Sequence, residues 1–196
     1  MKYNPDKHHR QSIRLKGYDY SSPGAYFITI CTHQRQCLFG EIVDGEMRLN
    51  ALGQLVSDEW MRSCSIRREI DFDAWVIMPN HIHGLVWIHL SDVPQNLVGA
   101  NGRLPLHEAS HSTNQDRLVP PMKPRSLSSF IAGFKSATTK RINLTRNAAG
   151  TPVWQRNYYD HIIRSEASLC RIRQYIQNNP LSWQQDQLHP SNPSNW

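Results

Sequence analysis

Two histidines that stand one residue apart are the first feature of this sequence that can do chemistry. His81 and His83 occur in the run Pro79–Trp87, which continues as an apolar, β-branched segment. Alternate side chains of a strand point to the same face, so both imidazoles can reach one metal ion. Two histidines on the solvated face of a strand would give the same pattern, and the pair alone leaves both interpretations open.

A tyrosine and an amide near the C-terminus are the second such feature. Tyr175 and Asn179 stand four residues apart, which places them on one face of a helix that Pro180 would end. Apolar residues occupy nearly the same face. From the residues alone, packing in the core or at its edge is therefore favoured for Tyr175 over contact with a substrate.

Together with a third run, these motifs resemble a known family. The runs Met78–Gly84, Trp154–His161 and Tyr175–Pro180 follow one another in the order of the HUH single-tyrosine transposases. Within that group the sequence resembles the REP-associated tyrosine transposases of bacteria, from about Arg14 to Trp183. Three motifs in the family order are much more specific than any one of them.

The resemblance implies a metal-dependent, single-stranded DNA endonuclease and strand transferase that cuts at hairpin or REP-like sequences. Tyr175 would be the nucleophile and would form a 5′-phosphotyrosine, while His81, His83 and Asn179 would hold a divalent metal ion, Mg²⁺ or Mn²⁺. A phenol is a weak nucleophile at neutral pH, so the ion would polarise a phosphate oxygen and align the scissile bond. Two other functions stay open: an insertion-sequence transposase that mobilises its own ends, and a hairpin nucleic-acid binder that no longer cuts.

Two further patterns compete for the chemistry. Tyr158 and Tyr159 are adjacent, so in a strand one would face the core and the other the solvent, and neither has an amide one helical turn further on. The run His107–His111 reads His-Glu-Ala-Ser-His and matches a zinc-protease motif. It lies among prolines and polar residues without the apolar stripe of a rigid helix, and we interpret it as a chance match.

The elements that must position these residues follow from periodicity and turn signals. Strands are predicted at 25–32, 72–78 and 82–88, an extended segment at 153–163, and a hairpin around Asp44 and Gly45. Helices are predicted after Asn50, from 126 to 143 and from 165 to 179. The β, α, β, β, α, β order with a terminal helix predicts the α+β class. We expect an antiparallel sheet with helices packed on one face, which is also the ferredoxin-like HUH nuclease fold that the resemblance implies.

The length of 196 residues suits a single HUH transposase or nuclease domain over residues 1–196. Residues 91–124 are rich in Pro, Gly, Asn and Ser with no sustained period, which predicts a flexible insertion. Residues 184–196 are predicted to form a disordered tail.

The balance of charge favours a polyanionic partner. A net charge of +6 and a pI near 9.3 fit single-stranded or hairpin DNA, although mild basicity also serves solubility. The resemblance favours the N-terminal Arg10, Arg14 and Lys16 as DNA contacts. Four further cations are candidates: Lys135, Arg141, Arg156 and Arg164.

The sequence also predicts where the protein works. Its first ten residues are polar and charged, and no stretch approaches about 18 consecutive apolar residues. The four cysteines form no Cys-x-x-Cys pair, as is typical of reduced thiols. We expect a cytoplasmic, nucleoid-associated protein that is a monomer or a homodimer and has no membrane segment.

Overall fold

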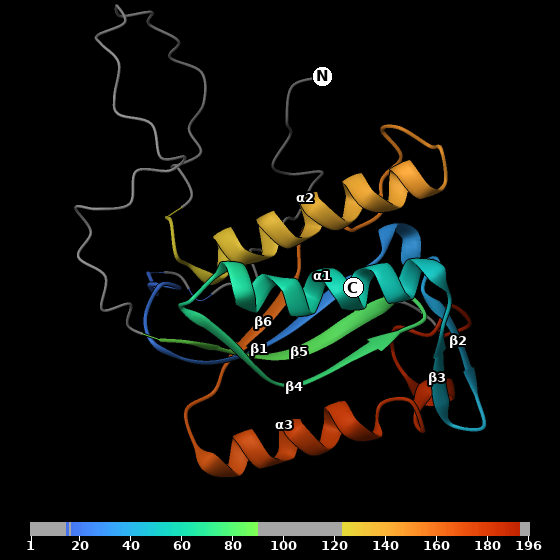
Figure 1. The fold of residues 1–196 in the computed structure, drawn as a ribbon. Helices are drawn as coiled ribbons and strands as arrows, with labels where there is room; N and C mark the ends of the chain where they lie inside the picture. Colours follow the sequence, from blue (N-terminus) through green and yellow to red (C-terminus); the bar gives the residue numbers. More distant parts are fainter. Residues whose placement is uncertain (1–14, 16, 90–122, 193–196) are drawn as a thin grey trace, which may run out of the picture.

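A four-stranded antiparallel sheet lies between helices in the computed structural model, which describes residues 15, 17–89 and 123–192 (Figure 1). The strands stand in the order β4-β5-β1-β6. They are β1 (Gly24–Cys31), β4 (Ile70–Met78), β5 (His81–Ile88) and β6 (Tyr159–Ile162). Helices α1 (Ala51–Ile66) and α2 (Leu127–Thr145) cover one face, and α3 (Glu166–Asn178) covers the other. The hairpin β2 (Gly40–Val43) and β3 (Glu46–Leu49) and two short 3₁₀ turns, His33–Arg35 and Trp183–Gln185, complete the described elements.

Each helix begins at a polar side chain that caps its free backbone amides. The Asn50 side chain accepts hydrogen bonds from the first turn of α1, and Ser126 and Ser165 do the same for α2 and α3. Asn50, Ser126 and Ser165 stand at or next to the positions where the sequence predicts a helix to begin. The order of elements and the α+β class are confirmed, and so is the hairpin around Asp44 and Gly45.

The main core lies between the sheet and the α1–α2 layer. Trp60 of α1 is fully buried there, and its ring stacks on Phe72 with the centroids 4.3 Å apart. Phe130 and Phe134 of α2 meet the same indole edge-on. Gly84 of β5 makes room for it, because a Cβ at this position would lie 2.7 Å from the Trp60 ring. The indole therefore joins both helices to the middle of the sheet.

The prediction that the helices pack on one face is wrong for α3. Strands β1 and β5 bury consecutive residues, so both of their faces are apolar and both need a cover. Phe27 and Leu85 point away from the main core and pack with Leu169 and Ile176 of α3. This second, smaller cluster holds the helix that carries Tyr175.

The prediction of a disordered tail over 184–196 is wrong for residues 184–192. Trp183 and Leu188 are buried, and the Leu188 amide donates a hydrogen bond to the Asp186 carboxylate. Two apolar anchors and a polar link thus fold this segment against the end of the sheet. Residues 193–196 lie outside the described residues, as do most of the 91–124 segment and the His107–His111 run. Within the part that the structure describes, no helix is long and apolar enough to cross a membrane.

Candidate active site

The candidate active site begins with side chains that share one level of the sheet on its α3 face. His83 of β5 pairs with Thr29 of β1 on one side and with Val76 of β4 on the other. Thr29 pairs in turn with Tyr159 of β6. His81 stands one step further along the same face of β5, so the strand period brings the two imidazoles together as predicted.

The two histidines face each other in a buried position. Their Nε2 atoms are 3.1 Å apart, and His81 and His83 are 0% and 2% exposed. Two imidazole lone pairs at this separation repel each other unless a proton or a cation lies between them or beside them. The pair is therefore arranged to share a positive charge.

Asn80 fixes which nitrogen of His81 faces the site. Its amide nitrogen donates to the backbone oxygens of Arg35, at 3.1 Å, and Leu188, at 2.7 Å. Its Oδ1 consequently faces the His81 Nδ1 at 2.8 Å. An amide oxygen only accepts hydrogen bonds, so Nδ1 carries the proton and the lone pair of His81 is on Nε2. Thr29 Oγ1 makes the corresponding contact with Nδ1 of His83, at 2.9 Å.

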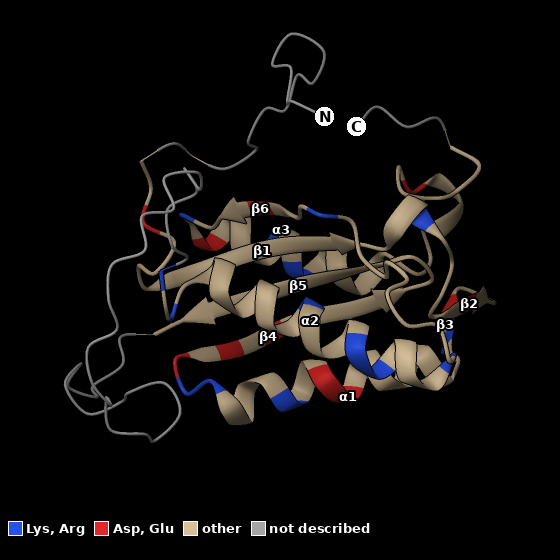
Figure 2. Ribbon diagram, turned by 90° about the horizontal axis from the view of Figure 1, so that it is seen from above, with Lys and Arg blue, Asp and Glu red and all other residues tan. Residues whose placement is uncertain are grey.

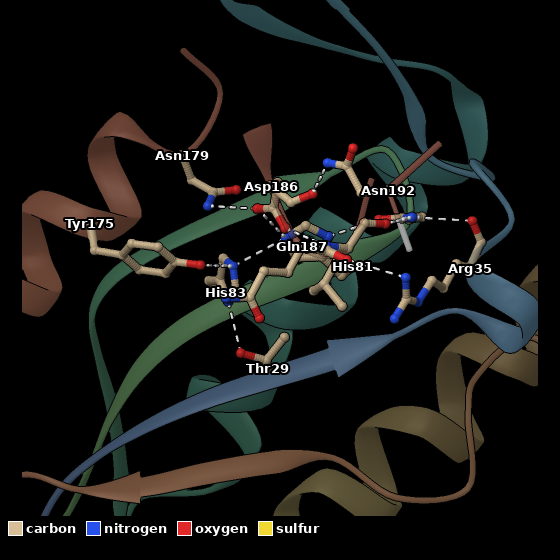
Figure 3. Close-up of polar contacts among 11 residues, drawn as sticks. Thr29, Arg35, His81, His83, Tyr175, Asn179, Asp186, Gln187 and Asn192 are labelled. Carbon is tan, nitrogen blue, oxygen red and sulfur yellow. Dashed lines mark hydrogen bonds and ion pairs between the residues drawn. The ribbon is translucent and has the colours of Figure 1, made fainter. Parts of the chain in front are cut away.

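Tyr175 reaches the histidine pair from α3 (Figure 3). Its hydroxyl lies 3.2 Å from Nε2 of His83, and its side chain is 47% exposed, so a substrate can reach it from solvent. The Phe27 ring meets the tyrosine edge-on, with the centroids 5.9 Å apart. The hydroxyl therefore stands at the border between the histidines and the solvent.

Asp186 is the functional residue that sequence reasoning missed. Its Oδ2 lies 3.9 Å from Nε2 of His81 and accepts a hydrogen bond from the Asn179 amide at 3.0 Å. The 3₁₀ turn and the buried Trp183 and Leu188 bring this carboxylate back to the sheet. Those two apolar residues within a polar segment are the only local signal in the sequence that it folds back.

The site offers a set of donors that fits a divalent metal ion. One ligand atom each from His81, His83 and Asp186 lie within 4.8 Å of one another. Asn179 adds a buried Oδ1 that has no hydrogen-bond partner among the described residues. Two neutral imidazoles, a carboxylate and an unpaired amide oxygen are a donor set that a metal ion completes. His81, His83 and Asp186 can thus hold a metal ion, and Asn179, the predicted third ligand, lies beside Asp186.

The surroundings keep these groups in the protonation states that such a site requires. Burial lowers the pKa of His81 to about 3, against the influence of the neighbouring Asn179 amide. Burial, followed by the charge of His81, also lowers the pKa of His83, against the attraction of Asp186. Both rings are therefore neutral at neutral pH, which is the form that ligates a metal. Burial raises the pKa of Tyr175 to about 12, so this residue is a phenol before any reaction.

A cavity of about 600 Å³ opens beside Tyr175 on the β1–β6 side. His83, Asn179 and Asp186 line it, and so do Gln155, Asn157, Tyr158 and Tyr159. Tyr158 and Tyr159, the competing nucleophiles, both line this cavity and are half-buried. Tyr158 packs on the main core and Tyr159 on the α3 cluster, so the two rings turn to different faces as predicted. The expectation that one of them faces the solvent is wrong, because both pack against apolar side chains.

The predicted DNA-contacting cations fall into three groups. Arg10, Arg14 and Lys16 lie outside the described residues. Lys135 and Arg141 have partners within the protein. Lys135 donates hydrogen bonds to the carbonyl oxygens of Gln155 and Asn157, and Arg141 donates one to the carboxylate of Glu59. Arg156 and Arg164 are exposed. Figure 2 shows the described Lys and Arg spread over several elements.

Comparisons with known proteins agree with this geometry at the level of fold. No protein-family model matches the chain. An uncharacterized protein of Haemophilus influenzae is 42% identical over 188 residues, which cover 96% of this chain and 97% of that protein. Among solved structures, a REP-associated tyrosine transposase bound to a REP hairpin superposes with a TM-score of 0.53 at 17% identity, covering 95% of this chain and 91% of its own. The structure of a protein named a putative transposase, from Deinococcus radiodurans, gives a TM-score of 0.42 at 18% identity, covering 84% of this chain and 95% of its own.

Proposed function

We propose that this chain, which belongs to the same family as the Haemophilus influenzae protein and has the fold of a REP-associated tyrosine transposase, is a metal-dependent single-stranded DNA endonuclease and strand transferase. The observation that carries the proposal is the Tyr175 hydroxyl, which lies 3.2 Å from a histidine of a group that can hold a metal ion. A phenol next to a metal site at a solvent border is an arrangement suited to nucleophilic attack on a phosphodiester.

In the proposed reaction Tyr175 attacks the scissile phosphorus. Its oxygen forms a bond to phosphorus, the bond to the 3′ oxygen of the preceding nucleotide breaks, the phenolic proton leaves to solvent and the departing 3′ oxygen gains a proton. The product is a 5′-phosphotyrosine, whose bond energy allows a later 3′-hydroxyl to displace Tyr175 and rejoin the strand.

The metal ion would be held by His81, His83 and Asp186, with Asn179 as a further oxygen donor. When bound, the ion polarises a non-bridging phosphate oxygen and offsets the charge of the transition state. Nitrogen and oxygen donors together suit Mn²⁺ and Mg²⁺. Asn80 and Thr29 hold the histidine rings with Nε2 toward the ion, and the folded 184–192 segment holds Asp186 beside them.

For the substrate we infer single-stranded DNA next to a hairpin, most directly a REP-like repeat. The solved structure that shares the fold is bound to a REP hairpin, and the positive net charge of this chain suits a DNA partner. Arg10, Arg14, Lys16, Arg156 and Arg164 are the cations that we propose for phosphate contact. Such a protein would work in the cytoplasm on the nucleoid.

We further infer that the sheet is the ferredoxin-like core of a single HUH domain. Support comes from the order β4-β5-β1-β6, in which α1 precedes β4, α2 precedes β6, and both helices lie on the same face. In this interpretation α3 is the added helix that brings the nucleophile to the histidine pair.

The test is an adduct assay on a denaturing gel. The protein is incubated with hairpin oligonucleotides taken from repeats near its own gene, together with Mn²⁺ or Mg²⁺. We expect a covalent protein–DNA band that disappears with chelator and with Tyr175→Phe, but persists with Tyr158→Phe. Hairpin binding without any adduct would instead identify a binder that does not cut.

A further inference from the structure

The cavity beside Tyr175 is larger than a phosphate group and a metal ion require. Its volume of about 600 Å³ lies in the range of roughly 300–1,000 Å³ that is typical of pockets enclosing a whole small molecule. A nucleoside belongs to that size class. The cavity exists because α3 packs chiefly on β4 and β5, so that, among the described helices, none covers the β1–β6 side of the same sheet face.

Aromatic rings form the floor of the cavity next to the nucleophile. Phe27 and Tyr159 pack against each other with their centroids 6.2 Å apart, and Phe27 also touches the ring of Tyr175. Tyr159 of β6 stands beside Thr29 of β1, which in turn stands beside His83 of β5. The rings meet edge to face, so an apolar aromatic surface begins where the catalytic groups end. Stacking on such rings is the usual way in which proteins bind unpaired bases.

Amide side chains form the adjacent wall on a backbone that is held in place. Gln155 and Asn157 both line the cavity. The backbone N–H of Gln155 donates to the carbonyl oxygen of Cys31, and the Lys135 ammonium group donates to the backbone carbonyl oxygens of both Gln155 and Asn157. Lys135 thus holds the backbone of this segment in place. Amides pair with the donor and acceptor edges of bases, so the wall has the chemistry needed to recognise a base.

We propose that this cavity is a nucleoside subsite, which takes an unpaired base adjacent to the scissile phosphate and stacks it near Phe27 and Tyr159 with its edge toward Gln155 and Asn157. The inference rests on the proposed function, because the phosphate of the same nucleotide would lie at Tyr175. It adds a contact to the base itself, in addition to those to the DNA backbone. The subsite would favour cleavage at an unpaired position, since a base held in a duplex cannot enter it.

A coupling experiment between base and residue tests the subsite. The scissile bond is first mapped with the wild-type protein, and an abasic nucleotide is then placed on either side of it. We expect one abasic position to slow single-turnover adduct formation about tenfold or more, as loss of a base–ring stack does elsewhere. Tyr159→Ala should slow the normal substrate by a similar factor, and should not slow the abasic substrate further. Tyr159→Phe, which keeps the ring, is the matched control and should stay within about threefold of wild type.

The proposal is contradicted if the abasic nucleotide and the substitution slow the reaction independently. In that case the abasic nucleotide slows Tyr159→Ala as much as it slows wild type, and the base does not contact that ring. A wild-type protein that forms no adduct would count against the proposed function instead. In that case 2-aminopurine, placed at each unpaired nucleotide beside the hairpin, reports stacking through its fluorescence in the Tyr175→Phe protein without any cleavage. A fluorescence change at one position that Tyr159→Ala abolishes supports the subsite, and an identical change in both proteins contradicts it.

Discussion

The two faces of the sheet are built from the same strands but bury different things. On the α1–α2 face, Ile28 and Ile82 lie under a continuous aromatic core centred on Trp60. On the α3 face, the neighbouring positions of the same strands carry Thr29, His81 and His83. Alternation along a strand thus separates a face that stabilises the fold from a face that carries the site. The polar face has fewer apolar contacts, and other interactions must hold its helix.

A group of hydrogen-bonded side chains, Arg173, Asp73 and Trp87, helps to hold α3 where apolar packing is limited, and we call this group the clamp. Arg173 of α3 donates two hydrogen bonds to Asp73 of β4, at 2.8 and 2.6 Å, and Trp87 donates a third to the same carboxylate at 3.1 Å. A paired guanidinium and carboxylate fix both position and direction. The clamp lies two residues from Tyr175 and so sets how α3 sits over the histidines.

The largest effect expected from this comparison is in the main core. Trp60→Ala should lower the free energy of unfolding by about 3–5 kcal/mol, because it leaves a large cavity among Phe72, Phe130 and Phe134. Leu169→Ala on the α3 face should cost less, about 2–3 kcal/mol, since its cluster is small and closer to solvent. Urea denaturation measures both. An equal or larger loss with Leu169→Ala would mean that the two faces do not differ in this way.

Next in size is the effect of Asn80 on metal binding. Asn80→Ala removes the acceptor that orients His81 and should weaken Mn²⁺ binding about 10–100-fold in calorimetric titration. The matched control is Asn50→Ala, which removes the cap of α1 and should lower stability by about 1 kcal/mol without changing metal affinity. The prediction fails if both variants bind Mn²⁺ as wild type does.

A smaller effect, and one that depends on pH, is expected at the clamp. The Arg173 guanidinium lowers the pKa of Asp73, with help from Trp87. A carboxyl whose pKa is lowered by folding stabilises the protein above its unfolded pKa of about 3.8 and loses that contribution as the pH falls through the folded value. Asp73→Asn should therefore cost roughly 1–2 kcal/mol at pH 7, a value kept low because Arg173 is 37% exposed, and progressively less as the pH falls below about 3.8.

The measurement at the clamp is the free energy of unfolding of wild type and Asp73→Asn at several pH values between 2 and 7. The difference between the two proteins should shrink as the pH is lowered. A difference that stays constant would show that the carboxylate charge does not hold α3.

The smallest effect is expected at the solvent end of the same clamp. Glu166 lies 3.8 Å from Arg173 and is 78% exposed. Glu166→Gln should change the free energy of unfolding by about 0.5 kcal/mol or less, as exposed ion pairs usually do. Thermal denaturation at low and high salt checks this. A loss of stability close to that of Asp73→Asn would mean that the ion pair at the N-terminus of α3 contributes as much to holding the helix.

Much of the site could be predicted because its parts depend on local periods. His81 and His83 meet because a strand repeats every two residues, and Tyr175 and Asn179 align because a helix turns about every four. Asp186 could not be predicted in the same way, because it arrives through the folding of a segment whose polar composition hides two apolar anchors. The buried runs of β1 and β5 did contain the information that both sheet faces are covered.

The cations were the hardest residues to predict. Lys135 and Arg141 have the charge that DNA attracts, but the sequence does not say whether a positive group meets a phosphate or a partner inside the protein. The structure pairs Arg141 with the buried Glu59 and uses Lys135 to hold the 155–157 segment. Net charge thus predicts the kind of partner, whereas the contacts depend on long-range packing.

The most direct test of the account is to locate the tyrosine that becomes attached to DNA. A hairpin substrate is incubated with protein and Mn²⁺, the covalent adduct is digested with protease and nuclease, and the peptide that carries the nucleotide is sequenced by mass spectrometry. The account predicts a 5′-phosphotyrosine on Tyr175, in the helix on the polar face of the sheet. Attachment to Tyr158 or Tyr159 would contradict it and would place the chemistry on β6 and the segment before it.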